Sequence, residues 1–298
     1  LETLFISAPF VVDLEPLGSL TNLQSLYIQA EPDDFTILAQ LSKLKELTIV
    51  SMDTRVFDWI RFLPNLESLD LAISPVEDLS FVSSLVRLRE LIVPYQMVGS
   101  ARYLAHLTRL ELLDLGNYPI VDPQSLAHLT ELRHLRLTLV SPGDLEFLES
   151  LRQLQWLSVE GSGLWDLTPL ERCPSLTHLY LAYNDIVDLR PLNSLKQLHV
   201  LDLRANAVEF LHPLADLSHL RTLYLNHNEI RELAALTDNP HFGFGTEIFL
   251  DYNPLFCQES AAKVEENRAT ADIDILQRRG ATIHYQQQYP CESPTPTP

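Results

Sequence analysis

The sequence predicts an α/β solenoid, in which a parallel concave β-sheet forms one side and short 3-10 or helical segments form the convex side. Three patterns lead to this prediction: a fixed period of about 22 residues, alternating leucines in the first half of each period, and a recurrent D-L-x-P-L phrase in the second half. A fixed period of this length indicates stacked units rather than one central core. The repeats open at Leu1, Leu23, Leu44, Leu66, Leu88, Leu110, Leu132, Leu154, Leu176, Leu198 and Leu220.

The first half of each repeat is expected to be a strand with one buried face. Positions 1, 4 and 6 hold the inward residues, which are leucine in the clearest copies, as in Leu176, Leu179 and Leu181. Alternation of apolar and polar residues is typical of a strand whose side chains point to opposite faces.

The second half of each repeat is expected to be a short helical turn. An aspartate recurs at position 13, where its carboxylate can cap backbone N–H groups, and a proline recurs at position 16, where its fixed φ suits a first turn. These residues are Asp13, Asp78, Asp122, Asp144, Asp166 and Asp188, and Pro16, Pro169, Pro191 and Pro213.

Asparagine occupies position 9 only in the later repeats. We expect these amides to bind the backbone of the turn and of the neighbouring repeat, and we expect less regular turns earlier in the chain. The asparagines are Asn184, Asn206, Asn228 and Asn253.

The period breaks after Leu236. The turn-forming residues 237–245 suggest an inserted loop, and residues 247–257 restore the phrase once. Residues 258–279 are expected to form a helix that stops at Gly280, followed by a strand at 281–285. The predicted organisation is a solenoid at 1–257, a C-terminal cap at 258–289 and a Pro/Thr linker at 290–298.

Leu1 is already the first leucine of a repeat, so we expect the natural chain to begin earlier. No charged-then-apolar leader is visible, which leaves an extracellular or cell-surface location and a cytoplasmic one both open. No apolar run reaches the 18 or so residues that span a bilayer, so no membrane span is expected.

The net charge of −19 argues against nucleic acid as a ligand, because phosphate binding needs a basic surface. A basic protein partner is one explanation of this charge. Solubility combined with the structural aspartates is the other.

The phrase L-x-x-L-x-L-x-x-N-x-I-x-D-L-x-P-L-x-x-L-x-x resembles the 22-residue subclass of leucine-rich repeats, over roughly residues 1–257. Bacterial internalins and the leucine-rich regulatory subunit of type-one protein phosphatase belong to that subclass. The resemblance implies a horseshoe or arc that binds proteins through its concave strand face. The ending L-D-Y-N-P-L-x-C looks like the closing segment of bacterial repeat proteins.

No catalytic arrangement emerges from the residues, and neither an enzyme activity nor a cofactor is expected. There is no phosphate loop, no H-E-x-x-H and no G-x-S-x-G, and the ten histidines are spread over many repeats, which argues against a metal site. Cys173 replaces a core leucine and is expected to be a buried thiol. Cys257 and Cys291 flank the cap and either form a disulfide or remain two free thiols.

Strand positions 3, 5, 7 and 8 are expected to face solvent and to form the binding surface. Trp, Tyr and Arg concentrate there in the later repeats, as they do at interface hot spots, although aromatic residues on a strand can also simply pack against one another. The predicted partner-binding patch is Trp156, His178, Tyr180, Tyr183, Arg204, Tyr224 and His227. A second patch is Ile92, Tyr95 and Leu112.

The sequence therefore predicts a non-enzymatic scaffold for protein–protein interaction, expected to be a monomer. The alternative is a structural spacer or a surface-display or targeting region of a larger bacterial protein, which the Pro/Thr tail and the abrupt start at Leu1 would suit.

Overall fold

The computed structural model describes residues 1–11, 13–52, 57–71, 74, 76, 78–94, 100–139, 145–256 and 263–286. The chain packs into two compact units, Leu1–Leu154 and Gln155–Pro298, which are described in turn.

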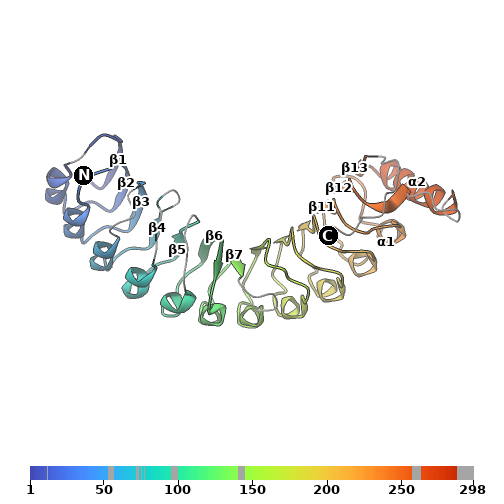
Figure 1. The fold of residues 1–298 in the computed structure, drawn as a ribbon, viewed down its shortest axis with the longest axis horizontal. Helices are drawn as coiled ribbons and strands as arrows, with labels where there is room; N and C mark the ends of the chain where they lie inside the picture. The colour runs from blue at the N-terminus through green and yellow to red at the C-terminus, as the bar shows by residue number, and fades with distance from the viewer. Residues whose placement is uncertain are drawn as a thin grey trace, which may run out of the picture. The chain divides into compact units, whose positions relative to one another are not determined.

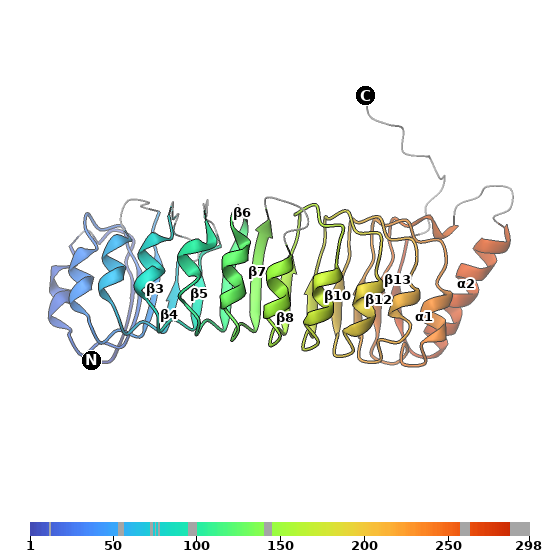
Figure 2. The same ribbon diagram turned by 90° about the horizontal axis from the view of Figure 1, so that it is seen from below.

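Strands of the first unit form a parallel sheet in chain order (Figures 1 and 2). Equivalent repeat positions pair across neighbouring strands, as Leu4 does with Leu26 and Leu26 with Leu47. The strands are β1 (Thr3–Ser7), β2 (Ser25–Gln29), β3 (Glu46–Val50), β4 (Ser68–Asp70), β5 (Glu90–Ile92), β6 (Leu112–Ile120) and β7 (His134–Leu139).

The second unit repeats this arrangement and includes the last strand of the cap. Leu157 pairs with Leu179, and the final strand continues the same register, with Ile248 opposite Ile283. The strands are β8 (Trp156–Val159), β9 (His178–Tyr180), β10 (Val200–Asp202), β11 (Thr222–Tyr224), β12 (Glu247–Phe249) and β13 (Thr282–His284).

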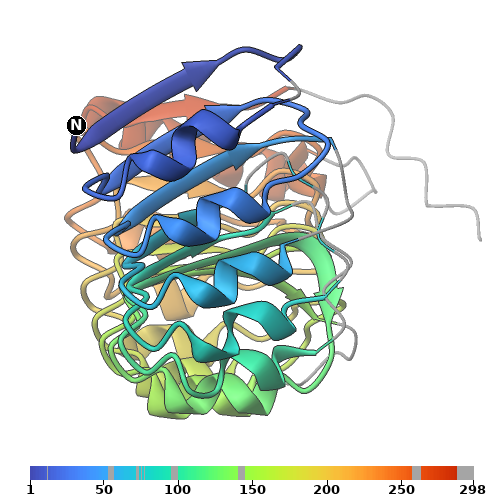
Figure 3. The same cartoon turned by 90° about the vertical axis from the view of Figure 1, so that its left-hand side faces the viewer.

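Short 3-10 helices lie opposite the strands within each unit, which Figures 1 and 3 show most clearly. In the first unit they are Glu15–Ser19, Thr36–Gln40, Asp58–Phe62, Ser80–Ser84, Ala101–Leu104, Pro123–His128 and Glu146–Ser150. In the second unit they are Thr168–Arg172, Arg190–Ser194, His212–Leu214 and Pro254–Phe256, joined by the α-helices α1 (Ala234–Asp238) and α2 (Lys263–Arg278).

The core of each unit lies between the strands and the short helices. The leucines at positions 1, 4 and 6 of the repeats from Leu44 onwards are almost fully buried, as Leu176, Leu179 and Leu181 show with no exposed surface. Truncating one such leucine to alanine costs roughly 2–5 kcal/mol, because it removes apolar contact and leaves a cavity. The predicted solenoid of parallel strands and short helices is confirmed.

The predicted asparagine ladder is confirmed in the second unit. Asn184 is buried; its Oδ1 accepts hydrogen bonds from the Ser162 and Leu164 amides, both at 3.0 Å, and its Nδ2 donates to the Val159 carbonyl at 2.8 Å. Asn206, Asn228 and Asn253 make the equivalent contacts one repeat further on. Each amide therefore satisfies backbone groups of two repeats at once.

In the first unit, where asparagine is absent from position 9, other side chains hydrogen-bond to the backbone of the turns. This agrees with the expectation of less regular turns early in the chain. The buried Ser74 hydroxyl donates to the Ile49 carbonyl at 3.0 Å and accepts from the Ser51 amide at 3.1 Å. The Glu31 carboxylate accepts from the Ser51 hydroxyl and from the Met52 amide. Serine and glutamate side chains differ in length from asparagine and from each other. They therefore bind different backbone groups, and the turns of the first unit differ from one another.

Strand β6 carries the largest departure from the repeat. It runs nine residues, and its register against β7 shifts between Asp114 and Pro119. Gly116 has a φ of +66°, and a Cβ there would lie 1.8 Å from the Pro94 carbonyl oxygen. Only glycine can occupy this position without moving the neighbouring backbone.

Four of the position-13 aspartates cap the following turn as predicted. The carboxylates of Asp13, Asp78, Asp166 and Asp188 accept from the amide two residues on, at 2.9 Å each, and Pro16, Pro169, Pro191 and Pro213 lie in the first turns. Asp122 contradicts the prediction. It adopts a φ of 57°, its side chain makes no cap, and the carboxylate accepts instead from the Ser100 hydroxyl at 2.7 Å. Asp144 lies outside the described residues.

The predicted loop at 237–245 is partly wrong. Helix α1 extends two residues into it, to Asp238, and the Thr237 amide donates to the Leu233 carbonyl at 3.2 Å. Helix α2 follows the prediction and ends before Gly280, whose φ is +93°. The boundaries at 257, 289 and 298 stay a prediction, and so does the Cys257–Cys291 pairing, which falls outside the described residues.

Candidate protein-binding surface

The strand face of the second unit gathers the side chains of the predicted patch. Trp156 lies opposite His178 in the β8–β9 pairing, and Tyr180 lies next to Ser158 in the same pairing. The alternation of a strand sends their leucine neighbours into the core and these side chains outward. We call this the aromatic face.

Trp156 and Tyr180 form the first contact on the aromatic face, with ring centroids 5.1 Å apart and planes tilted by 40°. Burial raises the pKa of the Tyr180 phenol, and a hydrogen bond with Trp156 works in the opposite direction. Burial also lowers the pKa of His178, and the charge of nearby His199 adds to this effect. Both effects favour the neutral imidazole, which has one donor and one acceptor nitrogen.

Arg204 is held in place from two sides. Its Nε donates to both carboxylate oxygens of Asp202 at 2.9 Å, and its guanidinium carbon lies 5.3 Å from the centre of the Tyr224 ring. Hydrogen bonding to Asp202 raises the pKa of Arg204. The prediction that position 5 faces solvent is wrong for Asp202, which is fully buried between the strands of Tyr180 and Tyr224 and paired with Arg204.

A stack of rings continues from Tyr224 onto the C-terminal cap. Tyr224 and Phe249 lie 4.7 Å apart, and Phe249 and His284 lie 4.3 Å apart, both nearly parallel. Phe249 pairs with Tyr224 in the sheet and so shares its repeat position, yet the predicted patch omits both Phe249 and His284. The pairing of Phe249 with His284 depends on the register of the cap strand, which no repeat predicts.

Residues at position 8 of the later repeats adopt a backbone conformation that favours glycine, although three of them carry bulky side chains. Gly161, Tyr183, Ala205, His227 and Tyr252 all have φ between 52° and 61°. A left-handed residue other than glycine costs roughly 1–2 kcal/mol. Tyr183 is nevertheless 64% exposed, and His227 stacks on Tyr252 with centroids 4.1 Å apart. Tyr252 is a further residue that the predicted patch omitted.

The second predicted patch is partly described. Ile92 and Leu112 are both half-buried and lie on neighbouring strands, β5 and β6, in the first unit. Tyr95 lies outside the described residues. On the first strands of this unit, Phe5 stacks on Tyr27 with ring centroids 4.2 Å apart.

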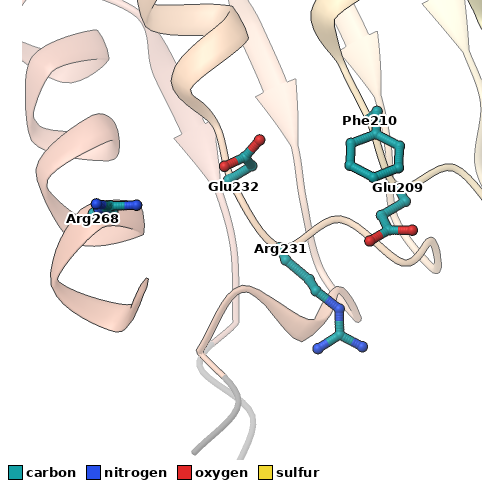
Figure 4. Close-up of a pocket in the computed structure, with 5 residues that line it drawn as sticks. All are labelled: Glu209, Phe210, Arg231, Glu232 and Arg268. Carbon is teal, nitrogen blue, oxygen red and sulfur yellow. The ribbon is translucent and has the colours of Figure 1, made fainter. Parts of the chain in front are cut away.

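A small pocket of about 200 Å³ in the second unit is lined by residues that lie outside the strands. Figure 4 shows its lining of Glu209, Phe210, Arg231, Glu232 and Arg268. The charges of two carboxylates and two guanidiniums cancel, so the net charge of the pocket favours neither an anion nor a cation. No sequence pattern indicated it, because Arg268 comes from α2 and the other residues come from two repeat turns.

The described residues contain no group of three or more His, Cys, Asp or Glu side chains that could hold a metal ion. Within the same part of the chain, no helix has the length and apolar character to cross a membrane. Cys173 is fully buried as predicted, and burial raises the pKa of its thiol to about 12.

Known proteins match this chain in its repeats. The family model described as leucine rich repeats (2 copies) matches residues 174–212. An internalin C2 from Listeria monocytogenes is 32% identical, with a TM-score of 0.56, over 62% of this chain and 80% of that one. The chain is a leucine-rich repeat protein. Its repeats are of the internalin-like kind.

Two further structures share the leucine-rich repeat fold. An internalin (inlF) from Listeria monocytogenes is 22% identical with a TM-score of 0.70, covering 90% of this chain and 83% of that one. A plant peptide hormone receptor, RGFR1, solved in complex with RGF2, is 15% identical with a TM-score of 0.66, covering 96% of this leucine-rich repeat protein and 50% of the receptor. No curated protein sequence matches the chain.

Proposed function

We propose that this leucine-rich repeat protein is a non-enzymatic scaffold that binds a protein partner on the aromatic face of its second unit. The observation that supports this proposal most strongly is that large aromatic rings contact one another across adjacent strands, on the face of the sheet opposite the leucine core. The core is already formed by leucines on the other side of the same strands.

The residue types on the aromatic face support binding. Trp, Tyr and Arg bury much area while keeping a polar group at the tip, which is why they dominate interface hot spots. Stacking and the Asp202 pair hold Tyr224, Phe249 and Arg204 in fixed positions. Side chains fixed before binding lose less entropy on binding, so they contribute more to affinity.

The charges around the aromatic face favour a basic protein partner. Arg204 is already neutralised by Asp202, and Glu160, Glu247 and Asp251 lie at outward positions of the same strands or turns. Their carboxylates would attract a basic segment and repel the phosphates of a nucleic acid. The receptor RGFR1, which shares the fold, was solved with RGF2 bound, and this supports a peptide-like segment as the bound element.

The test first selects peptide ligands and then locates their binding site on the protein. Peptides from a random library displayed on phage are selected on the folded protein, and their affinities are measured for the Trp156→Ala/Tyr180→Ala double variant. We expect at least a tenfold loss, because removing two hot-spot rings costs more than about 1.4 kcal/mol.

Trp165→Ala is the matched control, since Trp165 is a 61% exposed tryptophan of the same unit that is not on a strand. Its peptide affinity should equal that of the unaltered protein. Unchanged affinity in the folded double variant, or a loss only in Trp165→Ala, would remove the aromatic face from the proposal.

A further inference from the structure

The turns that lead from each short helix into the next strand carry a charge opposite to that of the chain. In the first unit, the last two residues of each repeat and the second residue of the next hold seven Lys or Arg against three Glu. The remainder of that unit holds four Lys or Arg against 18 Asp or Glu. The cations are Lys43, Lys45, Arg87, Arg89, Arg109, Arg133 and Arg152. We call this row the basic edge.

The backbone stacks these turns directly on one another. The Arg89 amide donates to the Glu67 carbonyl at 2.7 Å, the Glu111 amide to the Arg89 carbonyl at 2.8 Å, and the Arg133 amide to the Glu111 carbonyl at 2.9 Å. Successive side chains therefore project about 4.8 Å apart, the spacing of neighbouring strands. The separation lets guanidiniums from two repeats reach one small ligand.

A hollow of about 430 Å³ lies at the middle of the basic edge. Three arginines line it, together with one carboxylate and two uncharged side chains. The lining is Glu67, Val86, Arg87, Arg89, Thr108 and Arg109.

The charges around this hollow do not cancel. Arg89 pairs with Glu111, which also lies 3.8 Å from Arg133, and Glu67 lies 3.9 Å from Lys45. Among the residues that the structure describes, Arg87 donates only to the neutral Asn65 amide oxygen, at 2.8 Å. Arg109 has no hydrogen bond or ion pair to any residue that the structure describes. Five cations thus meet two carboxylates in this network.

We propose that this hollow binds a tetrahedral oxyanion, a phosphate or sulfate group. Guanidinium groups form paired, charge-assisted hydrogen bonds with such oxygens, and a doubly charged ion neutralises more of the excess charge than a carboxylate does. Four oxygens around one centre also accept donors from two repeats at once. The site lies in the first unit and is independent of the aromatic face.

Isothermal titration calorimetry with inorganic phosphate and with inorganic sulfate, at low ionic strength, tests the site. We expect saturable binding to the unaltered protein, and on the order of tenfold or more weaker binding to Arg87→Gln/Arg109→Gln, because the oxyanion loses the charge-assisted hydrogen bonds from two guanidiniums.

Arg152→Gln/Arg172→Gln is the control, because it removes the same net charge at two exposed arginines outside the hollow. It should bind phosphate like the unaltered protein, and so should Trp156→Ala/Tyr180→Ala. O-phosphoserine distinguishes the source of the ligand: binding assigns the site to a group carried by another molecule, and failure restricts it to the free ion. No saturable heat with either ion, equal weakening in both arginine pairs, or tighter binding of acetate would overturn the proposal.

Discussion

A single asparagine links two repeats wherever the turns of this protein are regular. In Asn184 the carbonyl oxygen accepts two backbone amides of the preceding repeat, and the amide nitrogen donates to carbonyls of both repeats. The role of this residue could be predicted from its position in the phrase. The substitutes in the first unit could not, because Ser74 and Glu31 reach different backbone groups.

Asn184→Ala should lower the free energy of unfolding by roughly 2–4 kcal/mol, because it leaves several buried backbone groups without partners. Urea unfolding followed by circular dichroism measures the change. Asn193→Ala is the control, since Asn193 is exposed and contacts only the Lys196 amine among described residues. Equal stability of the two variants would contradict the role of Asn184.

The capping aspartates give a pH dependence with a definite sign. Hydrogen bonds from the Thr168 hydroxyl and amide lower the pKa of Asp166 below its ordinary value of 3.8. A lowered pKa in the folded state stabilises the fold above the unfolded-state value, and this contribution disappears as the pH falls through the folded-state value.

Asp166→Ala should therefore be less stable than the unaltered protein at neutral pH, by about 0.5–2 kcal/mol before screening by solvent reduces it. The difference should shrink below about pH 4, which is near the ordinary aspartate pKa. Denaturant midpoints at pH 7 and pH 3 test this. A difference that grows on acidification would contradict the assigned cause.

Among the elements, the recurring strands and short helices were predictable from the period, and the helix and strand of the cap from their composition, but the packing of the cap was not predictable. Each strand and 3-10 helix repeats the same phrase, so the pattern in one repeat supports the next. Helix α1 occupies the repeat positions of the 3-10 helices, whereas α2 lies beyond the break in the period. Their packing is specific to this chain: Arg279 donates to the Thr237 carbonyl at 2.7 Å and to the Asn239 carbonyl at 3.3 Å. This contact joins the end of α2 to the end of α1.

Arg279→Gln should loosen the cap, because two carbonyls at the end of α1 lose a charged donor. Hydrogen–deuterium exchange of α1 and α2 amides should accelerate several-fold, while exchange in β8 and β9 stays unchanged. Arg278→Gln is the control from the last residue of α2, since the one ion pair of Arg278 with a described residue is to the exposed Asp274, at 4.0 Å. Equal acceleration in both variants would show that charge loss alone accounts for the effect.

At the scale of the molecule, the same repeat pattern supports two different surfaces, one in each unit. The first unit concentrates cations at its helix-to-strand turns, and the second concentrates stacked rings on its strands. The columns of the repeat predicted the aromatic face as far as Tyr224. The aromatic face continues through Phe249 and Tyr252 to His284. This continuation depends on ring stacking and on the register of the cap strand, neither of which the 22-residue period specifies.

Tryptophan fluorescence measures directly whether the aromatic face contacts a ligand. The three tryptophans are Trp59, which is buried in the first unit, Trp156 on the aromatic face and Trp165 off it. Trp165→Phe keeps Trp156 as the accessible reporter, and Trp156→Phe keeps Trp165.

Titration with a peptide selected from the phage library should shift the emission of Trp165→Phe to the blue and shield it from acrylamide, because Trp156 becomes buried. Emission of Trp156→Phe should stay unchanged at a peptide concentration that saturates that variant. Shielding of Trp165 with no change at Trp156 would contradict the assignment of binding to the aromatic face.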